Sequence, residues 1–450
     1  MKNKNNDMLT GNPVKSILLF SLPIMLSSLL QFNYTLVDNI IVGRYVSTDA
    51  LAAVGNVGSI NSFIIGAALG LTSGFTIPVA HSYGANDREK AGRFAGNSIS
   101  LAFIIGVCLV VIAHIISNPI LRLIGTPDDI IGLSASYVNI LYFGIPFQML
   151  SNNFTSISRA VGESKKPLYF FTVSIVLNFF LDLLLVKVFR KGVEGAALAT
   201  VISHVSVMLM TGIYVLKYNK NIGIKLSDFK VDKSISLKQL KLGIPVSLQF
   251  TITSIGTMCL QSVINSFGKN AMAGITAANR VENLTNIMMS GPGVATQTFV
   301  GQNYGAGNYD RIIKSVRKIL VLDLLISVLM SCTLYFAGPY VVQLFMTVPN
   351  TEMMTASKQY ILAISRCYSG VAVLFIMRNT LQGLGFTYSN TIAGAGELIG
   401  RLSVAFLLTP ILGFSALCYS GPAAWIFADI PLILIYLSKK RQFRALSDNR

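Results

Sequence analysis

Long apolar stretches run through the whole sequence, and short polar segments separate them. Apolar runs of about 20 residues can cross the hydrocarbon core of a bilayer as helices. The pattern therefore predicts an all-α membrane protein with twelve transmembrane helices. The predicted spans are 15–42, 50–81, 94–117, 133–158, 168–189, 194–216, 240–267, 271–302, 318–337, 357–381, 391–412 and 415–437. Prolines inside four of them predict bends, at Pro23, Pro146, Pro245 and Pro292.

Composition agrees with this class and excludes others. Of the 450 residues, 52% are apolar and only 12% are charged, about half the charged share of a soluble domain. So few charges exclude a water-soluble globular enzyme and a disordered protein. The net charge of +17 does not predict a nucleic-acid partner, because the basic residues lie in loops between spans and form no single patch. The five cysteines lie in apolar stretches and indicate neither a disulfide framework nor a metal site.

The distribution of Lys and Arg predicts the orientation in the membrane. With the amino terminus in the cytoplasm, cytoplasmic loops and tails carry 25 of these residues and the opposite loops carry 7. Cytoplasmic loops are enriched in Lys and Arg, so we expect a multi-pass protein of the cytoplasmic (inner) membrane with both termini inside. The first apolar segment is too long for a signal-peptide core, and we expect it to remain as the first helix.

The two halves of the chain resemble each other. The sequence Tyr-Gly-Ala begins at positions 83 and 304, prolines stand early in spans 1 and 7 at 23 and 245, and the segments RAVG and QGLG end at 162 and 385. The interval between matched positions is nearly the same in all three pairs, which indicates a duplication. Six spans per half make it a parallel repeat. The expected domains are an amino-terminal lobe (1–216), a basic cytoplasmic linker (217–239), a carboxy-terminal lobe (240–437) and a basic tail (438–450).

Two similar six-helix lobes favour a secondary active transporter that works by alternating access, because such lobes can rock about the seam between them. The sequence has neither a GxxxxGK[ST] segment for ATP nor an HExxH segment for zinc. We therefore expect a transporter and no enzyme. A membrane-embedded enzyme would need a large polar loop beside a catalytic cluster, and a channel would show uncoupled conductance.

Acidic residues inside the spans need an explanation, because an ionisable side chain in hydrocarbon costs about 2.5–3.5 kcal/mol on insertion scales. Asp38 lies near the outer end of span 1. Asp182 lies about 15 residues from the inner end of span 5, which places it about 22 Å deep, in the outer half of the membrane. Asn178 lies one turn from Asp182 on the same helix face. Tyr137 in span 4 and Thr200 in span 6 are expected at the same depth.

This set of side chains predicts an ion-coupling site. Two close carboxylates repel each other when both are charged, so such a pair can capture a proton or, with oxygen neighbours, a sodium ion. The alternative is structural: Asp38 would cap an irregular helix end, and Asp182 would only hydrogen-bond a neighbouring helix.

The other acids inside spans have separate interpretations. Glu397 and Arg401 are four residues apart, which predicts a salt bridge within one helix. Asp323 is expected at the membrane interface, one turn from a cytoplasmic loop. Glu282 could meet a cationic substrate. Asp429 has no predicted partner.

Candidates for a drug cavity are polar groups in the first span of each lobe and polarizable or charged groups in span 8, since such surfaces bind flat cations. They are Gln31, Asn33, Tyr34, Gln249, Gln261, Asn265, Glu282, Met288 and Met289. The three histidines, His81, His114 and His204, lack metal-ligand spacing and are expected to be structural.

Taken together, these residues resemble the multidrug and toxic compound extrusion (MATE) family. The resemblance covers about residues 12–440 and depends on the two Tyr-Gly-Ala loops, on Asp38 shortly before Ile-Ile-Val-Gly, and on Asn178-x-x-x-Asp182. The sequence is most similar to the DinF/MepA-like branch. The resemblance implies ion coupling in the amino-terminal lobe through the site described above, and it adds Asn152 of span 4. The NorM-like branch also uses acids in spans 7 and 10, but 240–267 and 357–381 contain none.

The expected function is therefore multidrug efflux, with organic cations or drugs exchanged for H⁺ or Na⁺. We expect no cofactor other than the coupling ion, a possible Na⁺ at Asp38, Asn178 and Asp182, a lipid bilayer as the surroundings, and a monomer. The main rival within the wider superfamily is a flippase for lipid-linked precursors. A flippase would need Arg and Lys in its cavity to hold pyrophosphate, and few basic residues lie within the spans.

Overall fold

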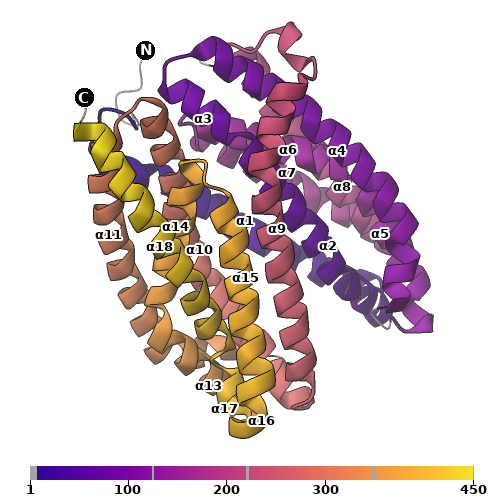
Figure 1. The fold of residues 1–450 in the computed structure, drawn as a ribbon. Coiled ribbons are helices and arrows are strands. Elements are labelled where there is room, and N and C mark those ends of the chain that lie inside the picture. Colours follow the sequence, from indigo (N-terminus) through magenta and orange to yellow (C-terminus); the bar gives the residue numbers. More distant parts are fainter. Residues whose placement is uncertain (1–7, 124–125, 219–221, 347–349, 449–450) are drawn as a thin grey trace. The chain divides into compact units, whose positions relative to one another are not determined.

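The protein is helical throughout the part of the chain that its computed structural model describes (Figure 1). This part comprises residues 8–123, 126–218, 222–346 and 350–448, without the side chains of residues 33–36, 59–60, 123 and 445–448. No strand occurs in these ranges, which confirms the predicted all-α class.

The helical segments of the first half are α1 (Pro13–Tyr45), α2 (Thr48–Phe75), α3 (Ile77–Gly84), α4 (Arg88–Leu123), α5 (Asp128–Phe143), α6 (Ile145–Ala160), α7 (Lys165–Asp182), η1 (Leu183–Val188), α8 (Gly192–Ile213) and η2 (Tyr214–Tyr218). The later segments are η3 (Leu226–Phe229), α9 (Lys233–Asn265), α10 (Lys269–Gly305), α11 (Tyr309–Phe336), α12 (Gly338–Val341), η4 (Val342–Phe345), α13 (Thr351–Cys367), α14 (Ser369–Gly383), α15 (Tyr388–Ser403), η5 (Val404–Leu408), α16 (Thr409–Leu412), α17 (Phe414–Leu417) and α18 (Ser420–Asp448).

The helices account for the twelve predicted spans. Within the described ranges, nine spans are long and apolar enough to cross a membrane, and two bent pairs, α5–α6 and α13–α14, raise the number to eleven. Helix α10 is the twelfth. It has 37 residues but many polar side chains, and it packs against α11, α13 and α14. Protein neighbours thus cover a helix that is too polar to face lipid on all sides.

Apolar side chains cover the outside of the helices as well as the core. On α4, Val107, Val111 and Ile115 are one turn apart and all exposed. In a water-soluble protein such a stripe would be covered, so the outer face of this helix is suited to lipid.

The structure repeats as the sequence does. The two bent spans break at Gly144 and Tyr368, by 46° and 57°. The first break lies beside Pro146, as predicted; the second has no proline and was not predicted. Glycines 162 and 385 follow matching helices, and both have φ of 88°, a left-handed conformation that glycine adopts without a steric penalty. The π-helical segments η1 and η5 begin at positions 183 and 404, the same interval that separates the two Tyr-Gly-Ala loops.

Packing divides the chain into two compact units. One comprises Met1–Met25 and Leu248–Arg450, and the other comprises Leu26–Ser247. We call them the carboxy-terminal unit and the amino-terminal unit. Helices α1 and α9 each pass from one unit to the other, close to Pro23 and Pro245 respectively. The predicted boundaries at 216 and 240 follow the sequence repeat and remain a prediction about the lobes.

The first two turns of α9 pack closely against α4 within the amino-terminal unit. The Asn97 amide on α4 donates to Ser236 Oγ at 3.0 Å and to Gln239 Oε1 at 2.7 Å. The Gln239 amide in turn donates to the carbonyls of Phe75 and Phe94. The predicted linker therefore ends in a buried set of hydrogen bonds.

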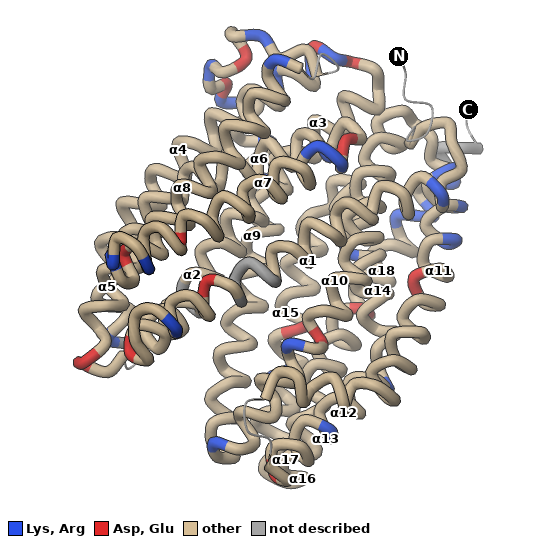
Figure 2. Tube along the Cα trace, turned by 180° about the vertical axis from the view of Figure 1, so that it is seen from behind, with Lys and Arg blue, Asp and Glu red and all other residues tan. Residues whose placement is uncertain are grey.

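The segment before α1 and the last helix, α18, both pack at the start of α11, in the carboxy-terminal unit. Arg311 donates to the carbonyls of Met8 and Gly11, and Phe443 of α18 stacks on Tyr309. These two segments lie on one side of the unit, as expected for an even number of spans. In both units Lys and Arg lie mainly near helix ends, and long stretches of helix between them carry no charge (Figure 2).

Candidate functional site

Asp38 of α1 and Asp182 of α7 form the centre of the candidate site. Their side chains lie in hydrogen-bonding contact, although they are far apart in the sequence. Asp38 is 8% exposed and Asp182 is fully buried. A carboxylate oxygen can only accept, so a hydrogen bond between two carboxyl groups requires a proton on one of them. The geometry is thus suited to a pair that shares one proton.

The local structure of α7 positions Asp182. The regular helix ends at this residue, and the chain continues as the π-helical segment Leu183–Val188. π-Helical turns are rare and occur often at functional sites. Asn178, one turn earlier, is also buried. The aspartate and the asparagine therefore share a buried face directly before the change in helix geometry.

A cavity of about 250 Å³ within the amino-terminal unit adjoins this pair. Four of the predicted residues line it together with Asp38: Gln31, Tyr137, Asn152 and Thr200. Tyr137 also lies near both carboxyl groups, since it interacts electrostatically with each. The structure therefore brings the predicted side chains of spans 1, 4, 5 and 6 together in one place.

The cavity also contains polar residues that the sequence analysis missed. They are Asn61, Gln148, Ser151, Ser174, Ser203 and His204. His204 was expected to be structural, but it lies one turn after Thr200 on α8 and lines the same cavity. The spacing of four residues from Thr200 was the available signal. Asp38 is the one acidic residue among the described lining residues, which include neither Lys nor Arg.

The predicted drug-cavity residues of the second half lie in the carboxy-terminal unit. The Gln249 amide donates to Thr253 at 3.4 Å, and the Gln261 amide donates to Asn265 at 2.9 Å. Met289 is buried in the apolar core, whereas Met288 is exposed. The side chains of Asn33 and Tyr34 lie outside the described residues.

Glu282 has a hydrogen-bonded place in that unit. The Tyr360 hydroxyl donates to Glu282 Oε2 at 2.9 Å, and the Asn286 amide donates to Oε1 at 3.5 Å. A carboxylate with these hydrogen bonds can hold helices α10 and α13 together. The role of Glu282 in substrate binding stays a prediction.

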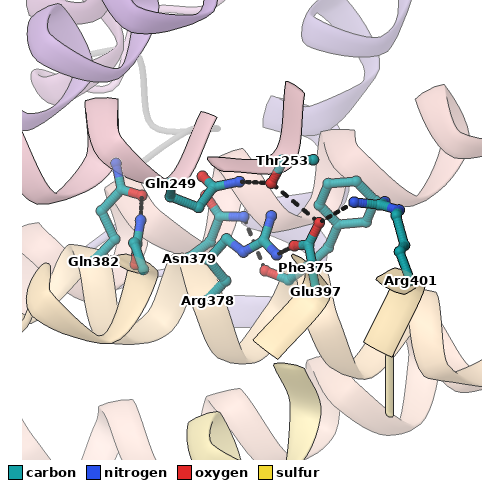
Figure 3. A network of polar contacts seen from close by, with 9 residues as sticks. Gln249, Thr253, Phe375, Arg378, Asn379, Gln382, Glu397 and Arg401 are labelled. Atoms are coloured by element: carbon teal, nitrogen blue, oxygen red, sulfur yellow. Dashed lines mark hydrogen bonds and ion pairs between the residues drawn. The ribbon is translucent and has the colours of Figure 1, made fainter. Parts of the chain in front are cut away.

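A polar network connects three helices of the same unit (Figure 3). Glu397 of α15 forms ion pairs with Arg378 of α14 and, at 3.5 Å, with Arg401. It also accepts a hydrogen bond from Thr253 of α9 at 3.2 Å. The predicted Glu397–Arg401 salt bridge is confirmed, and Arg378 is a second partner that the sequence did not reveal.

The residues around Asp38 and Asp182 suit a proton or a hard cation. The carboxyl groups, the Asn178 amide and the Thr200 hydroxyl are oxygen donors, which Na⁺ prefers over nitrogen or sulfur. Among the described residues, no group of three or more His, Cys, Asp or Glu side chains is placed to hold a metal ion. The donor set thus fits a weakly held monovalent ion better than a transition metal.

Comparison with known proteins identifies a family whose model matches both halves of the chain. The family model MatE matches residues 23–184 and 245–407. The probable multidrug resistance protein YoeA of Bacillus subtilis is 30% identical over 96% of both chains. The multidrug export protein MepA of Staphylococcus aureus is 24% identical over 98% of both chains.

Solved structures share the fold. A crystal structure of MATE in the bent conformation superposes with a TM-score of 0.90 at 24% identity, covering 100% of this chain and 99% of that one. An outward-facing multidrug resistance MATE family transporter of the MOP superfamily also gives a TM-score of 0.90, at 24% identity and 99% coverage of both chains.

Proposed function

Since the chain belongs to the MatE family of multidrug efflux transporters, we propose that it is an antiporter that exports organic cations in exchange for H⁺ or Na⁺. The supporting observation is the contact between Asp38 and Asp182, beside a cavity that Asp38 lines. In this proposal the protein acts as a monomer in the cytoplasmic membrane, with both termini in the cytoplasm.

In this proposal, the charge of the Asp38–Asp182 pair couples binding of the ion to release of the organic cation. An ion that enters from outside neutralises the carboxyl groups, the packing of α1 around Pro23 changes, and an organic cation leaves the cavity. The units then close toward the outside, the ion dissociates toward the cytoplasm, and a new substrate binds. Exchange requires each ligand to favour a different state, because equal affinity for both states would shift nothing.

The cavity lining favours a cationic substrate. Asp38 supplies a negative charge, and the described lining has no Lys or Arg to oppose it. A flippase for lipid-linked precursors would instead need guanidinium or ammonium groups to hold pyrophosphate. The rival function is therefore disfavoured at this cavity.

The test is dye transport in proteoliposomes under separately imposed proton and sodium gradients. Asp38→Asn and Asp182→Asn should each reduce ion-driven ethidium efflux to background while protein abundance stays equal. Asp49→Asn is the matched control, because Asp49 is an exposed acid at the start of α2. Undiminished efflux in both aspartate variants would remove the proposed site, and the gradient that drives wild-type efflux identifies the ion.

A further inference from the structure

Asp323 is a buried acid that the proposed coupling site does not use. It lies near the middle of α11 in the carboxy-terminal unit and is 1% exposed. Helix α11 begins at Tyr309, well before the predicted span, so Asp323 lies several turns into the helix, and its expected position at a membrane interface stays a prediction. Both carboxyl oxygens are buried, and neither has a hydrogen-bond partner among the residues that the structure describes.

Glu397 in the same unit shows what a buried carboxylate needs in order to stay charged. Its two oxygens face the guanidinium groups of Arg378 and Arg401. Asp429 interacts electrostatically with Arg378 as well. Asp323 has no such ion pair within the described ranges. An unpaired charge is strongly disfavoured in an apolar interior, and a carboxyl group there takes up a proton instead.

The surroundings of Asp323 offer a polar route out of the core. The Tyr368 hydroxyl interacts electrostatically with Asp323 and donates to Asn286 Oδ1 at 3.0 Å. Asn286 donates to Glu282, which also accepts from Tyr360. Polar side chains of this kind bind water molecules that enter between the helices, and water, unlike the Asn286 amide, passes on a proton by exchanging its own hydrogen bonds.

Four titratable groups of the elements around α11 have partners other than Asp323. Helix α11 packs against α10, α12, α13, α14 and α18. Glu282 of α10 and Tyr360 of α13 bond to each other, and Arg378 of α14 pairs with Glu397, near Asp429 of α18. The Tyr368 phenol is the neighbour of Asp323 that is connected, through Asn286, to Glu282 and Tyr360.

The repeat shows that only one half carries an acid at the position of Asp323. The repeat interval of 221–223 residues relates Asp323 to Ser100, Leu101 or Ala102 of α4, and none of these is an acid. By contrast, Tyr137 and Tyr360 occupy matching positions, and each lies beside a carboxyl group in its own unit. A buried acid where the other half has an uncharged residue needs a compensating role, because replacement by an apolar residue would remove its desolvation penalty.

We propose that Asp323 is a proton-binding site of the carboxy-terminal unit, which holds a proton in this conformation and exchanges it with solvent through Tyr368 and Asn286. The site is separate from the Asp38–Asp182 pair, and its protonation does not depend on which substrate is transported. Binding is a simple transfer: a proton from water bonds to one Asp323 oxygen, and its release restores the carboxylate.

Infrared spectroscopy of the purified full-length protein in lipid tests both parts of the proposal. The wild-type spectrum minus that of Asp323→Asn should contain the carbonyl band of one protonated carboxyl group per chain. Asp310→Asn is the matched control, because Asp310 is an exposed acid in the first turn of the same helix. Its difference spectrum should contain carboxylate bands. Transfer to D₂O should shift the Asp323 carbonyl band.

Two results would overturn the proposal. Carboxylate bands in the Asp323→Asn difference spectrum would show that the residue is ionised. A carbonyl band that stays unshifted in D₂O would show a sealed structural proton. If Asp323→Asn does not accumulate in membranes, Asp323→Glu keeps the acid and should move the same band. Transport can fail in the Asp38 and Asp182 variants without affecting any of these readings.

Discussion

Gly400 allows α15 and α18 to pack with their backbones in contact, and its replacement by alanine is the sharpest test of the fold. A methyl group built on Gly400 would lie 2.7 Å from the Ala423 carbonyl oxygen and 2.9 Å from Ala424 Cα. Gly396, one turn earlier, faces the Phe427 carbonyl in the same way. Backbone atoms cannot rotate aside as a side chain can. The helices must therefore separate, as in other membrane helix pairs packed through small residues.

The size of the effect follows from that distance. Ordinary contacts begin at 3.4 Å, so α15 and α18 must move apart by about 0.7 Å. Forced overpacking of this kind costs about 1–3 kcal/mol. Removing a helical glycine returns about 1 kcal/mol of helix propensity. Gly400→Ala should therefore lower the free energy of unfolding by about 0–2 kcal/mol, with about 1 kcal/mol as the central value.

Gly132→Ala is the matched control for this substitution. Gly132 also lies within a helix, α5, but an added methyl group would meet nothing within 4 Å. The control should be unchanged or more stable by up to about 1 kcal/mol. The same chemical change thus has opposite expected signs at the two positions.

Trp425 is a convenient reporter for the measurement. It is the single tryptophan of the chain, is 6% exposed, and lies on α18 with its ring 6.1 Å from that of Tyr368. Its fluorescence follows unfolding of the detergent-solubilised protein in increasing denaturant. Equal stability of Gly400→Ala and Gly132→Ala would refute the argument from backbone contact.

Two further predictions concern charged contacts of the carboxy-terminal unit. Glu397→Gln removes the carboxylate that pairs with Arg378 and Arg401 and should destabilise the protein by about 3–5 kcal/mol. Arg401→Gln leaves the ion pair between Glu397 and Arg378 intact and should cost less. The Trp425 unfolding curve measures both variants, and the reverse order would contradict the network. Arg311→Ala removes two hydrogen bonds to the segment before α1, each worth about 1.5–3 kcal/mol, so hydrogen exchange of residues 8–13 should accelerate. The control Lys314→Ala changes an exposed neighbour on the same helix and should leave that exchange rate unchanged.

Local pattern was sufficient for much of the architecture. Apolar length predicts the spans, and the constant offset of the repeat predicts matched halves, because both properties are carried by residues close in sequence. The salt bridge between Glu397 and Arg401 was also predictable, since helix geometry places residues four apart on one face. The break at Tyr368 was not predicted, because no proline marks it; Ser369 and Gly370, directly after it, were the available signal.

The candidate site depends on information that local pattern does not carry. Depth along each helix placed Asp38 and Asp182 at one level, but their contact also depends on how α1 and α7 are rotated and which helices are neighbours. The same information was missing for His204, which lines the cavity, and for Asp323, which proved to be buried. The sequence does not reveal which face of an all-round apolar helix points toward its neighbours, because lipid and the protein interior select the same residues.

The sequence by itself therefore determined that this protein is a duplicated bundle of membrane helices with a small number of acids inside it. Only the tertiary structure decided which acids meet a partner. Asp38 meets Asp182, Glu397 meets two arginines, and Asp323 has no ion pair within the described chain. The reason is physical: spans are selected by transfer from water into lipid, residue by residue, whereas the fate of a buried charge depends on atoms a few ångströms away that come from distant parts of the chain.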